Sequence, residues 1–236
     1  MGDVNWLRES YGFSTIASSV DELVILDVSL DRSPASRAQF LDAAGTIGEL
    51  FFAPIAVGGR ISNLTEARTA LSVGAEKVVL NTALIDSRKD VLGIVEALGS
   101  QAVVGSVDLR RDNSSYRAFV ADGHRAVPHD VPNYLEKVLQ LGVGELLLNS
   151  IDQDGTGMGF DLDVLHLVPA NCVVPIVIMG GAGTAEHLKI PLSLSAIDGV
   201  ATGNLFNFVG DGLPAARARL IADGQPLASF AGVVLP

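Results

Sequence analysis

Asp108 is the residue of this sequence that most clearly points to chemistry. It follows the apolar run QAVVGSV (101–107) and precedes Leu109 and two arginines. A carboxylate at the end of a buried strand is costly unless something compensates it, and carboxylates are common general acids and bases. We therefore predict that Asp108 is catalytic. Because acid–base catalysis usually employs a pair of titratable groups, a second one is expected near it.

Polar residues or glycines also follow the other apolar runs of the chain. A polar residue at the end of one run would indicate no more than a strand cap. Here seven runs end in this way. The repeated pattern favours a ligand-binding mouth at one edge of a sheet. The residues at the other strand ends are Asp27, Gly58 to Arg60, Asn81 and Thr82, Asn149 and Ser150, Gly180 and Gly181, and Thr202 to Asn204.

Two glycine pairs, at 58–59 and 180–181, indicate anion binding. Glycine lets backbone N–H groups approach an anion closely, and a following helix N-terminus adds partial positive charge. The segment GGAGT before AEHL fits this description, and GNLF from the next run would complete the same site. One such pair alone is equally typical of a tight turn. Their recurrence suggests two anion sites and a ligand with two phosphates.

The segment IDQDGTGMGFD (151–161) has the composition of an active-site loop, or of a plain strand-to-helix turn. It lacks the ligand spacing of a calcium loop. The four histidines fall in different segments without paired spacing, so solvated or capping roles are expected for them: His124, His129, His166 and His187. The sequence therefore predicts no metal site and no cofactor.

Seven short apolar runs, nearly continuous rather than alternating, predict parallel strands covered on both faces. Amphipathic stretches with helix start and stop signals lie between them, for example at 63–74 and 131–144. Alternating strands and helices imply a parallel α/β sheet, and no linker divides the chain, so one domain is expected over 1–236. The predicted strands cover 22–28, 52–59, 77–82, 101–108, 145–151, 174–181 and 199–204.

An internal repeat sharpens this architecture. VDELVILDVSLD echoes VGELLLNSIDQD, APIAVGGRIS echoes VPIVIMGGAGT, and GAEKVVLNTALI echoes SAIDGVATGNLF, in the same order. The simplest arrangement is two half-barrels that close into a (βα)8 barrel of the TIM type. Residues 1–20 form an atypical N-terminal segment without a clear strand, so the first strand is expected to be lacking or replaced. The apolar end 227–236 would fill the gap, or would be an ordinary tail after a C-terminal helix within 209–236.

Composition excludes several classes of function. The 236 residues are 48% hydrophobic and 18% charged, with a net charge of −11 and a pI near 4.6. This charge argues against nucleic acid and anionic membranes as partners. The single cysteine, Cys172, excludes a disulfide within the chain. No signal peptide or membrane-length apolar run is evident, so a cytoplasmic protein is expected.

Taken in order, these motifs resemble the cyclase subunit of imidazole glycerol phosphate synthase and its relatives. The segments that carry the resemblance, over about residues 20–208, include DELVILDV, GAEKVVLNTALI, GELLLNSIDQDGT and GGAGT.EH. The resemblance implies a barrel that binds a bisphosphorylated ribonucleotide across its mouth. It further implies that a class I glutaminase docks on the opposite face and that ammonia travels through the barrel to close an imidazole ring. Two aspartates, on strands one and five, act as acid and base in that family.

The resemblance assigns roles to individual residues. Asp108 matches the aspartate of strand five. Glu22, Lys77 and Glu145 match a charged gate at the bottom of the barrel, although surface salt bridges are the other interpretation of such charges. One phosphate site matches Gly59, Arg60, Asn81 and Thr82, and the other matches Asp154, Gly155, Gly181, Thr202 and Gly203.

The sequence departs from the family at three points. The strand-one aspartate has no counterpart, and Arg60 replaces a third glycine, where its guanidinium would either bind phosphate or block the site. Asn149 and the segment VVLNTALI fit a sister branch at least as well, the glycosyl amidation-associated barrels that deliver ammonia to sugar modification. Three functions remain open: a cyclase, an ammonia conduit for surface-glycan amidation, and a catalytically impaired scaffold that binds a glutaminase or a phosphate ligand.

Overall fold

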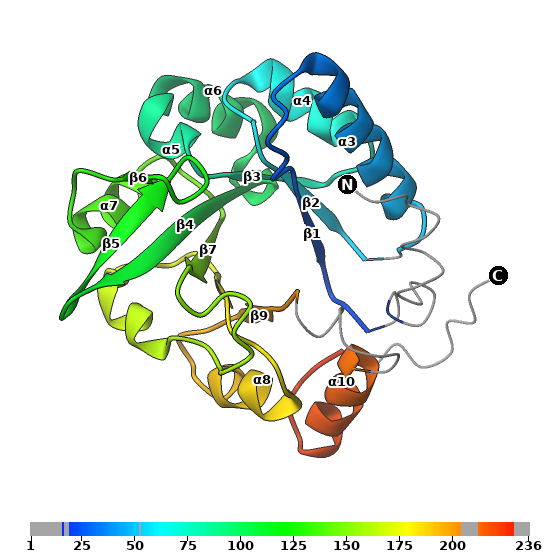
Figure 1. The fold of residues 1–236 in the computed structure, drawn as a ribbon, viewed down its shortest axis with the longest axis vertical. Helices are drawn as coiled ribbons and strands as arrows, with labels where there is room; N and C mark the ends of the chain where they lie inside the picture. Colours follow the sequence, from blue (N-terminus) through cyan, green and yellow to red (C-terminus); the bar gives the residue numbers. More distant parts are fainter. Residues whose placement is uncertain (1–15, 17–18, 52, 204–211, 229–236) are drawn as a thin grey trace.

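Seven parallel strands form the centre of the molecule (Figure 1). The computed structural model describes residues 16, 19–51, 53–203 and 212–228. The strands are hydrogen-bonded side by side in chain order, and the helices lie outside them. Each predicted strand is confirmed, most of them shorter than expected: β1 (Leu23–Leu26), β2 (Ile55–Gly58), β3 (Lys77–Leu80), β4 (Val103–Asp112), β7 (Glu145–Ser150), β8 (Ile176–Met179) and β9 (Gly199–Ala201).

The helices between the strands begin at the signals visible in the sequence. Ser33, Asn63, Asp130 and Thr184 each accept a hydrogen bond at a helix start through their side chains, as N-cap residues do. The alternation of these helices with parallel strands is the predicted TIM-type α/β fold. The helices are α3 (Pro34–Gly48), α4 (Leu64–Ser72), α5 (Ala83–Asp86), α6 (Arg88–Leu98), α7 (Val131–Leu139), α8 (Ala185–Leu192) and α10 (Gly212–Ala222), with 3-10 turns η1 (Ser100–Ala102) and η2 (Leu162–Leu167).

The strands bury both of their faces, which explains why their sequences do not alternate. Outward residues such as Val78, Val103 and Leu146 are fully buried under the helices. Inward residues from all seven parallel strands form a separate apolar cluster that no helix residue enters. Its buried members are Ala56, Val79, Val104 and Leu147. A cluster fed by every strand indicates a sheet that curves around its own interior.

The strand register follows the internal repeat. Leu23 lies opposite Ile55 in the first half, and Leu146 lies opposite Ile176 in the second. In the internal repeat, DELV corresponds to GELL and PIAV corresponds to PIVI. Leu23 therefore corresponds to Leu146, and Ile55 corresponds to Ile176. The two halves therefore pair their strands alike, as two half-barrels would.

Some expectations fall on parts of the chain outside the described residues. The missing or replaced first strand concerns residues 1–20, of which only 16, 19 and 20 are described, and the closing tail concerns 229–236. The extent of the single domain stays a prediction. Within the described ranges, no helix has the length and apolar character needed to cross a membrane.

One expectation is wrong: β4 does not end at Asp108 but continues to Asp112. From Asp108 onward it pairs antiparallel with β5 (Ser115–Val120), which pairs in turn with β6 (Arg125–Ala126). A two-residue loop at 113–114 closes the β4–β5 hairpin, and Asn113 adopts the left-handed conformation that such a loop requires. Asp108 thus lies where the parallel barrel strand passes into a hairpin.

Candidate active site at the carboxyl ends of the strands

The barrel interior is layered along its strands. On β3 the inward residues are Lys77, Val79 and, just beyond the strand, Asn81, because side chains alternate between the two faces. Glu145, Leu147 and Asn149 follow the same order on β7. Charged residues therefore lie at the amino ends of the strands, an apolar layer lies in the middle, and amides lie at the carboxyl ends.

Asp108 lies among the amides at the carboxyl ends. Asn149 Nδ2 donates a hydrogen bond of 3.0 Å to Asp108 Oδ1, and Asn81 Nδ2 lies 3.3 Å from Oδ2. The same Asn81 nitrogen donates to the Ser106 carbonyl at 3.0 Å, which fixes its orientation. The two amides from the neighbouring strands β3 and β7 hold the carboxylate from both sides.

The surroundings of Asp108 favour its protonated form. Burial raises the pKa of this carboxyl above its usual range, and the hydrogen bond from Asn149 offsets only part of the effect. The negative charges of Asp122 and Asp154 raise it further. A carboxyl group with a raised pKa is suited to give and take protons near neutral pH.

Asp122 belongs to the site although the sequence analysis did not select it. It lies at the tip of the β5–β6 hairpin and forms an ion pair with Arg32 of the loop after β1. The neighbouring Ala121 N–H donates to Thr82 Oγ1 at 3.0 Å. The hairpin tip is therefore bonded to the loops after β1 and β3. The segment VADGH, typical of a turn, is the signal that would have located it.

The first predicted phosphate site is built around Asp27. Gly59 has φ +85°, and a Cβ there would lie 2.5 Å from the Asp27 carbonyl oxygen, so only glycine fits. Arg60 Nη2 donates to the Ser29 carbonyl at 2.8 Å, and its Nε lies 3.4 Å from Asp27 Oδ2. Arg37 Nη1 donates to the same oxygen at 3.2 Å.

The network around Asp27 decides where Arg60 points. The side chain of Asp27 is 1% exposed. Burial alone would raise its pKa, but hydrogen bonds from Ser29 and the charge of Arg60 outweigh burial and lower it. Arg60 thus neutralises a buried carboxylate, and it forms no hydrogen bond with Asn81 or Thr82 within the described part of the chain.

The second predicted phosphate site combines the loops after β7, β8 and β9. Gly159 N–H donates to the Gly181 carbonyl at 2.7 Å, which ties the first two loops together. A Cβ on Gly181 would lie 2.0 Å from the Gly159 carbonyl oxygen, whereas one on Gly155 or Gly203 would meet nothing within 4 Å. Asp154 lies in the same loop as Gly155, and Thr202 precedes Gly203. Two of the glycines therefore border open space.

The three predicted gate residues come together at the opposite end of the barrel. Lys77 Nζ lies 2.6 Å from Glu22 Oε2 and 2.8 Å from Glu145 Oε2. All three side chains are about one-quarter exposed or less, at 23%, 26% and 18% respectively. The triad joins β1, β3 and β7 across the interior, which a salt bridge confined to the outer surface would not do.

The charges of this triad do not balance. Burial raises the pKa of Glu22, against the lowering influence of its hydrogen bond to Lys77. Burial disfavours the charged form of Lys77, but the hydrogen bonds to Glu145 and Glu22 outweigh it and raise the pKa of the lysine. Two carboxylates thus share one ammonium group, and Glu22 Oε1 has no hydrogen-bond partner within the described residues.

Known proteins of similar sequence identify the family of this chain. Residues 14–210 match the family model described as histidine biosynthesis protein. A protein of Parasynechococcus marenigrum, whose name describes it as subunit hisF2 of imidazole glycerol phosphate synthase, is 36% identical over 219 residues, 93% of this chain and 81% of that protein. The HisF subunit of Pyrobaculum aerophilum is 35% identical over 188 residues, 80% of this chain and 73% of its own. The HisF subunit of Chloroherpeton thalassium is 35% identical over 204 residues, 86% and 80% of the two chains. This chain therefore belongs to the histidine biosynthesis protein family, as a relative of the HisF subunit of imidazole glycerol phosphate synthase.

Proposed function

We propose that this protein is a cyclase-type barrel that uses ammonia from a class I glutaminase on a bisphosphorylated ribonucleotide. The observation that carries the proposal is the position of Asp108, held by Asn81 and Asn149 at one end of an apolar interior. The other end of that interior holds the charged triad of Lys77 with two glutamates. The relatives named HisF support the same reading.

Asp108 would move protons during ring closure, and the two amides would hold its carboxylate in place. Backbone N–H groups beside Gly155, Gly181 and Gly203 would bind one phosphate at the loops after β7, β8 and β9. The loops after β2 and β3 would bind the other phosphate. At the amino ends of the strands, the gate triad would face the glutaminase.

A second candidate is an ammonia conduit for glycosyl amidation, and one observation favours it. Two amide side chains donate hydrogen bonds to Asp108. Among the described residues, no titratable side chain is hydrogen-bonded to it. A site with one carboxylate and two amides suits the delivery of ammonia better than two-group acid–base catalysis.

Turnover of the bisphosphorylated ribonucleotide with ammonium salts separates these candidates. The cyclase proposal expects the full chain to release aminoimidazole carboxamide ribotide, and expects Asp108→Asn to lower the rate about 10²- to 10⁴-fold. Asp112→Asn is the matched control, because Asp112 lies on the same strand but is exposed. Absence of turnover by the unaltered protein would overturn the cyclase role, and a glycan-amidation assay with a glutaminase would then test the conduit.

A further inference from the structure

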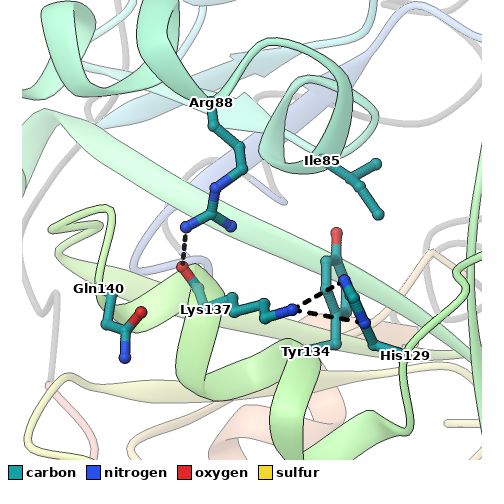
Figure 2. A pocket seen from close by; sticks show the side chains of 6 residues that line it. All are labelled: Ile85, Arg88, His129, Tyr134, Lys137 and Gln140. Atoms are coloured by element: carbon teal, nitrogen blue, oxygen red, sulfur yellow. Dashed lines mark hydrogen bonds between the residues drawn. The ribbon is translucent and has the colours of Figure 1, made fainter.

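A cavity lies among the outer helices. Its volume is about 240 Å³, and helices α5, α6 and α7 and the residues that flank α7 supply its walls (Figure 2). No residue of a strand lines it. The lining residues are Ile85, Arg88, His129, Tyr134, Lys137 and Gln140.

The charged groups of this cavity are all cationic or basic. Neither Arg88 nor Lys137 forms an ion pair with a carboxylate in the part of the chain that the structure describes. The nearby Arg125 is different, because it is paired with Asp86. In a chain with a net charge of −11, these two half-buried side chains concentrate positive charge without a carboxylate partner among the described residues.

Within the described ranges, Arg88 and Lys137 form hydrogen bonds only with uncharged acceptors, and the one made by Arg88 is long. Arg88 Nη2 lies 3.5 Å from the Lys137 carbonyl oxygen, at the limit of a hydrogen bond. Lys137 Nζ lies 2.9 Å from His129 Nε2, and since an ammonium group only donates, this ring nitrogen accepts. Figure 2 shows the guanidinium, the ammonium and the imidazole gathered around one space.

A further polar group in the wall lacks a partner. Tyr134 is 1% exposed, and its hydroxyl has no hydrogen-bond partner within the described residues. Buried hydroxyl groups are usually hydrogen-bonded. Gln140, the C-cap residue directly after α7, adds an amide to the lining.

We propose that this cavity binds a phosphate-type oxyanion, as free phosphate or as the phosphate group of a small ester. The planar fork of Arg88 matches two phosphate oxygens at once, and Lys137 supplies a second point of positive charge. The volume is below the roughly 300–1,000 Å³ typical of pockets for larger ligands, which limits the ligand to a small one.

Isothermal titration of the full chain with inorganic phosphate, at fixed ionic strength, tests this site. Arg88→Gln and Lys137→Gln should each weaken binding at one site about tenfold or more. Lys89→Gln is the matched control: it removes the same charge from the neighbouring, exposed residue of α6 and should leave binding unchanged. Binding at the barrel mouth would persist in all three variants, since none alters that site.

Two further titrations, one with another variant and one with another ligand, test the role of Arg88 and the nature of the anion. Arg88→Lys retains the charge but not the fork, so it should bind phosphate more weakly than the unaltered chain and more tightly than Arg88→Gln. Ribose 5-phosphate in place of phosphate identifies the source: tighter binding of the ester assigns the site to esters, and equal binding assigns it to free phosphate. Identical isotherms for Arg88→Gln, Lys137→Gln and Lys89→Gln would overturn the proposal.

Discussion

At the scale of single residues, Asp27 and Asp108 show how surroundings divide two carboxylates, one buried and one half-buried, between different tasks. Asp27 is neutralised by Arg37 and Arg60 and has a lowered pKa, so it holds the loop after β1 as a permanent anion. Asp108 is held by neutral amides and has a raised pKa, so it retains the capacity to exchange a proton. Only the second arrangement serves acid–base chemistry.

Replacing Asn149 with leucine should shift the pH dependence of the reaction. The variant Asn149→Leu removes the hydrogen bond that lowers the pKa of Asp108, so the carboxyl group should keep its proton to higher pH. If the ionised form acts as the base, the acidic limb of kcat/KM against pH moves upward and the rate at neutral pH falls about tenfold. A pH profile that superimposes on that of the unaltered protein would contradict this role for Asn149.

The raised pKa of Asp108 also predicts how stability depends on pH. Because the folded state binds this proton more tightly than the unfolded state, the stabilising contribution is present at low pH and is lost as the pH rises through the folded pKa. Asp108→Asn should therefore raise the melting temperature at pH 7, by about 2–4 °C for each kcal/mol gained. The difference should shrink below the usual carboxyl range. Melting curves that differ equally at pH 3 and pH 7 would refute the argument.

At the scale of elements, the sequence was informative wherever burial dominated. The apolar runs identified all seven parallel strands, because strands covered on both faces cannot carry charge in their middles. The hairpin of β5 and β6 was missed because it has only one buried face. Ala118 and Val120 are buried, while Ser115 and Arg117 are exposed, so β5 does not form the continuous apolar run of a barrel strand. Alternation over 115–118, where Ser115 and Arg117 are exposed and Tyr116 and Ala118 are not, was the available signal.

The loop glycines of the second half differ in what they tolerate. Gly181→Ala should destabilise the protein by more than about 3 kcal/mol, because its Cβ would meet the Gly159 carbonyl oxygen at 2.0 Å and its φ is +101°. Gly155→Ala should cost only the strain of φ +76°, about 1–2 kcal/mol. Gly203→Ala, in open space, is the control and should change stability least. Urea unfolding measures all three, and equal losses would contradict the ranking.

Side-chain direction at the strand ends was beyond the reach of the sequence. The family resemblance grouped Arg60 with Asn81 and Thr82, but pairing with the buried Asp27 turns its guanidinium toward the loop after β1. The cavity beneath Arg88 was equally hidden. Its lining residues come from three helices and from the residues on either side of α7, and no local pattern in the chain connects them.

At the scale of the whole molecule, the barrel interior separates two polar ends by an apolar layer. The layer consists of inward residues such as Ala56, Val79, Val104 and Leu147. Above it lies Asp108 with its amides, and below it lies the triad of Lys77. The sequence predicted the polar residues at the carboxyl ends of the strands, whereas the layering of the interior and the ion pairs of the triad required the structure.

Lys77→Met should uncouple the two ends if a glutaminase docks below. Removing the ammonium leaves Glu22 and Glu145 to repel each other, so turnover with glutamine and a class I glutaminase should fall about tenfold or more. Turnover with ammonium salts should change far less, because Asp108 is untouched. Lys189→Met, which removes an exposed ion pair with Asp223, is the control. Equal losses with both nitrogen sources would argue against a gate.

β4 pairs with barrel strands along its first part and with β5 alone at its end. The part from Val103 to Leu109 pairs with the neighbouring barrel strands and fixes the position of Asp108. The part from Arg110 to Asp112 pairs with β5 alone. Insertions or deletions beyond Arg110 would therefore change the hairpin without shifting the barrel register. The outer part of the hairpin can therefore vary in length and sequence independently of the barrel strands that hold Asp108.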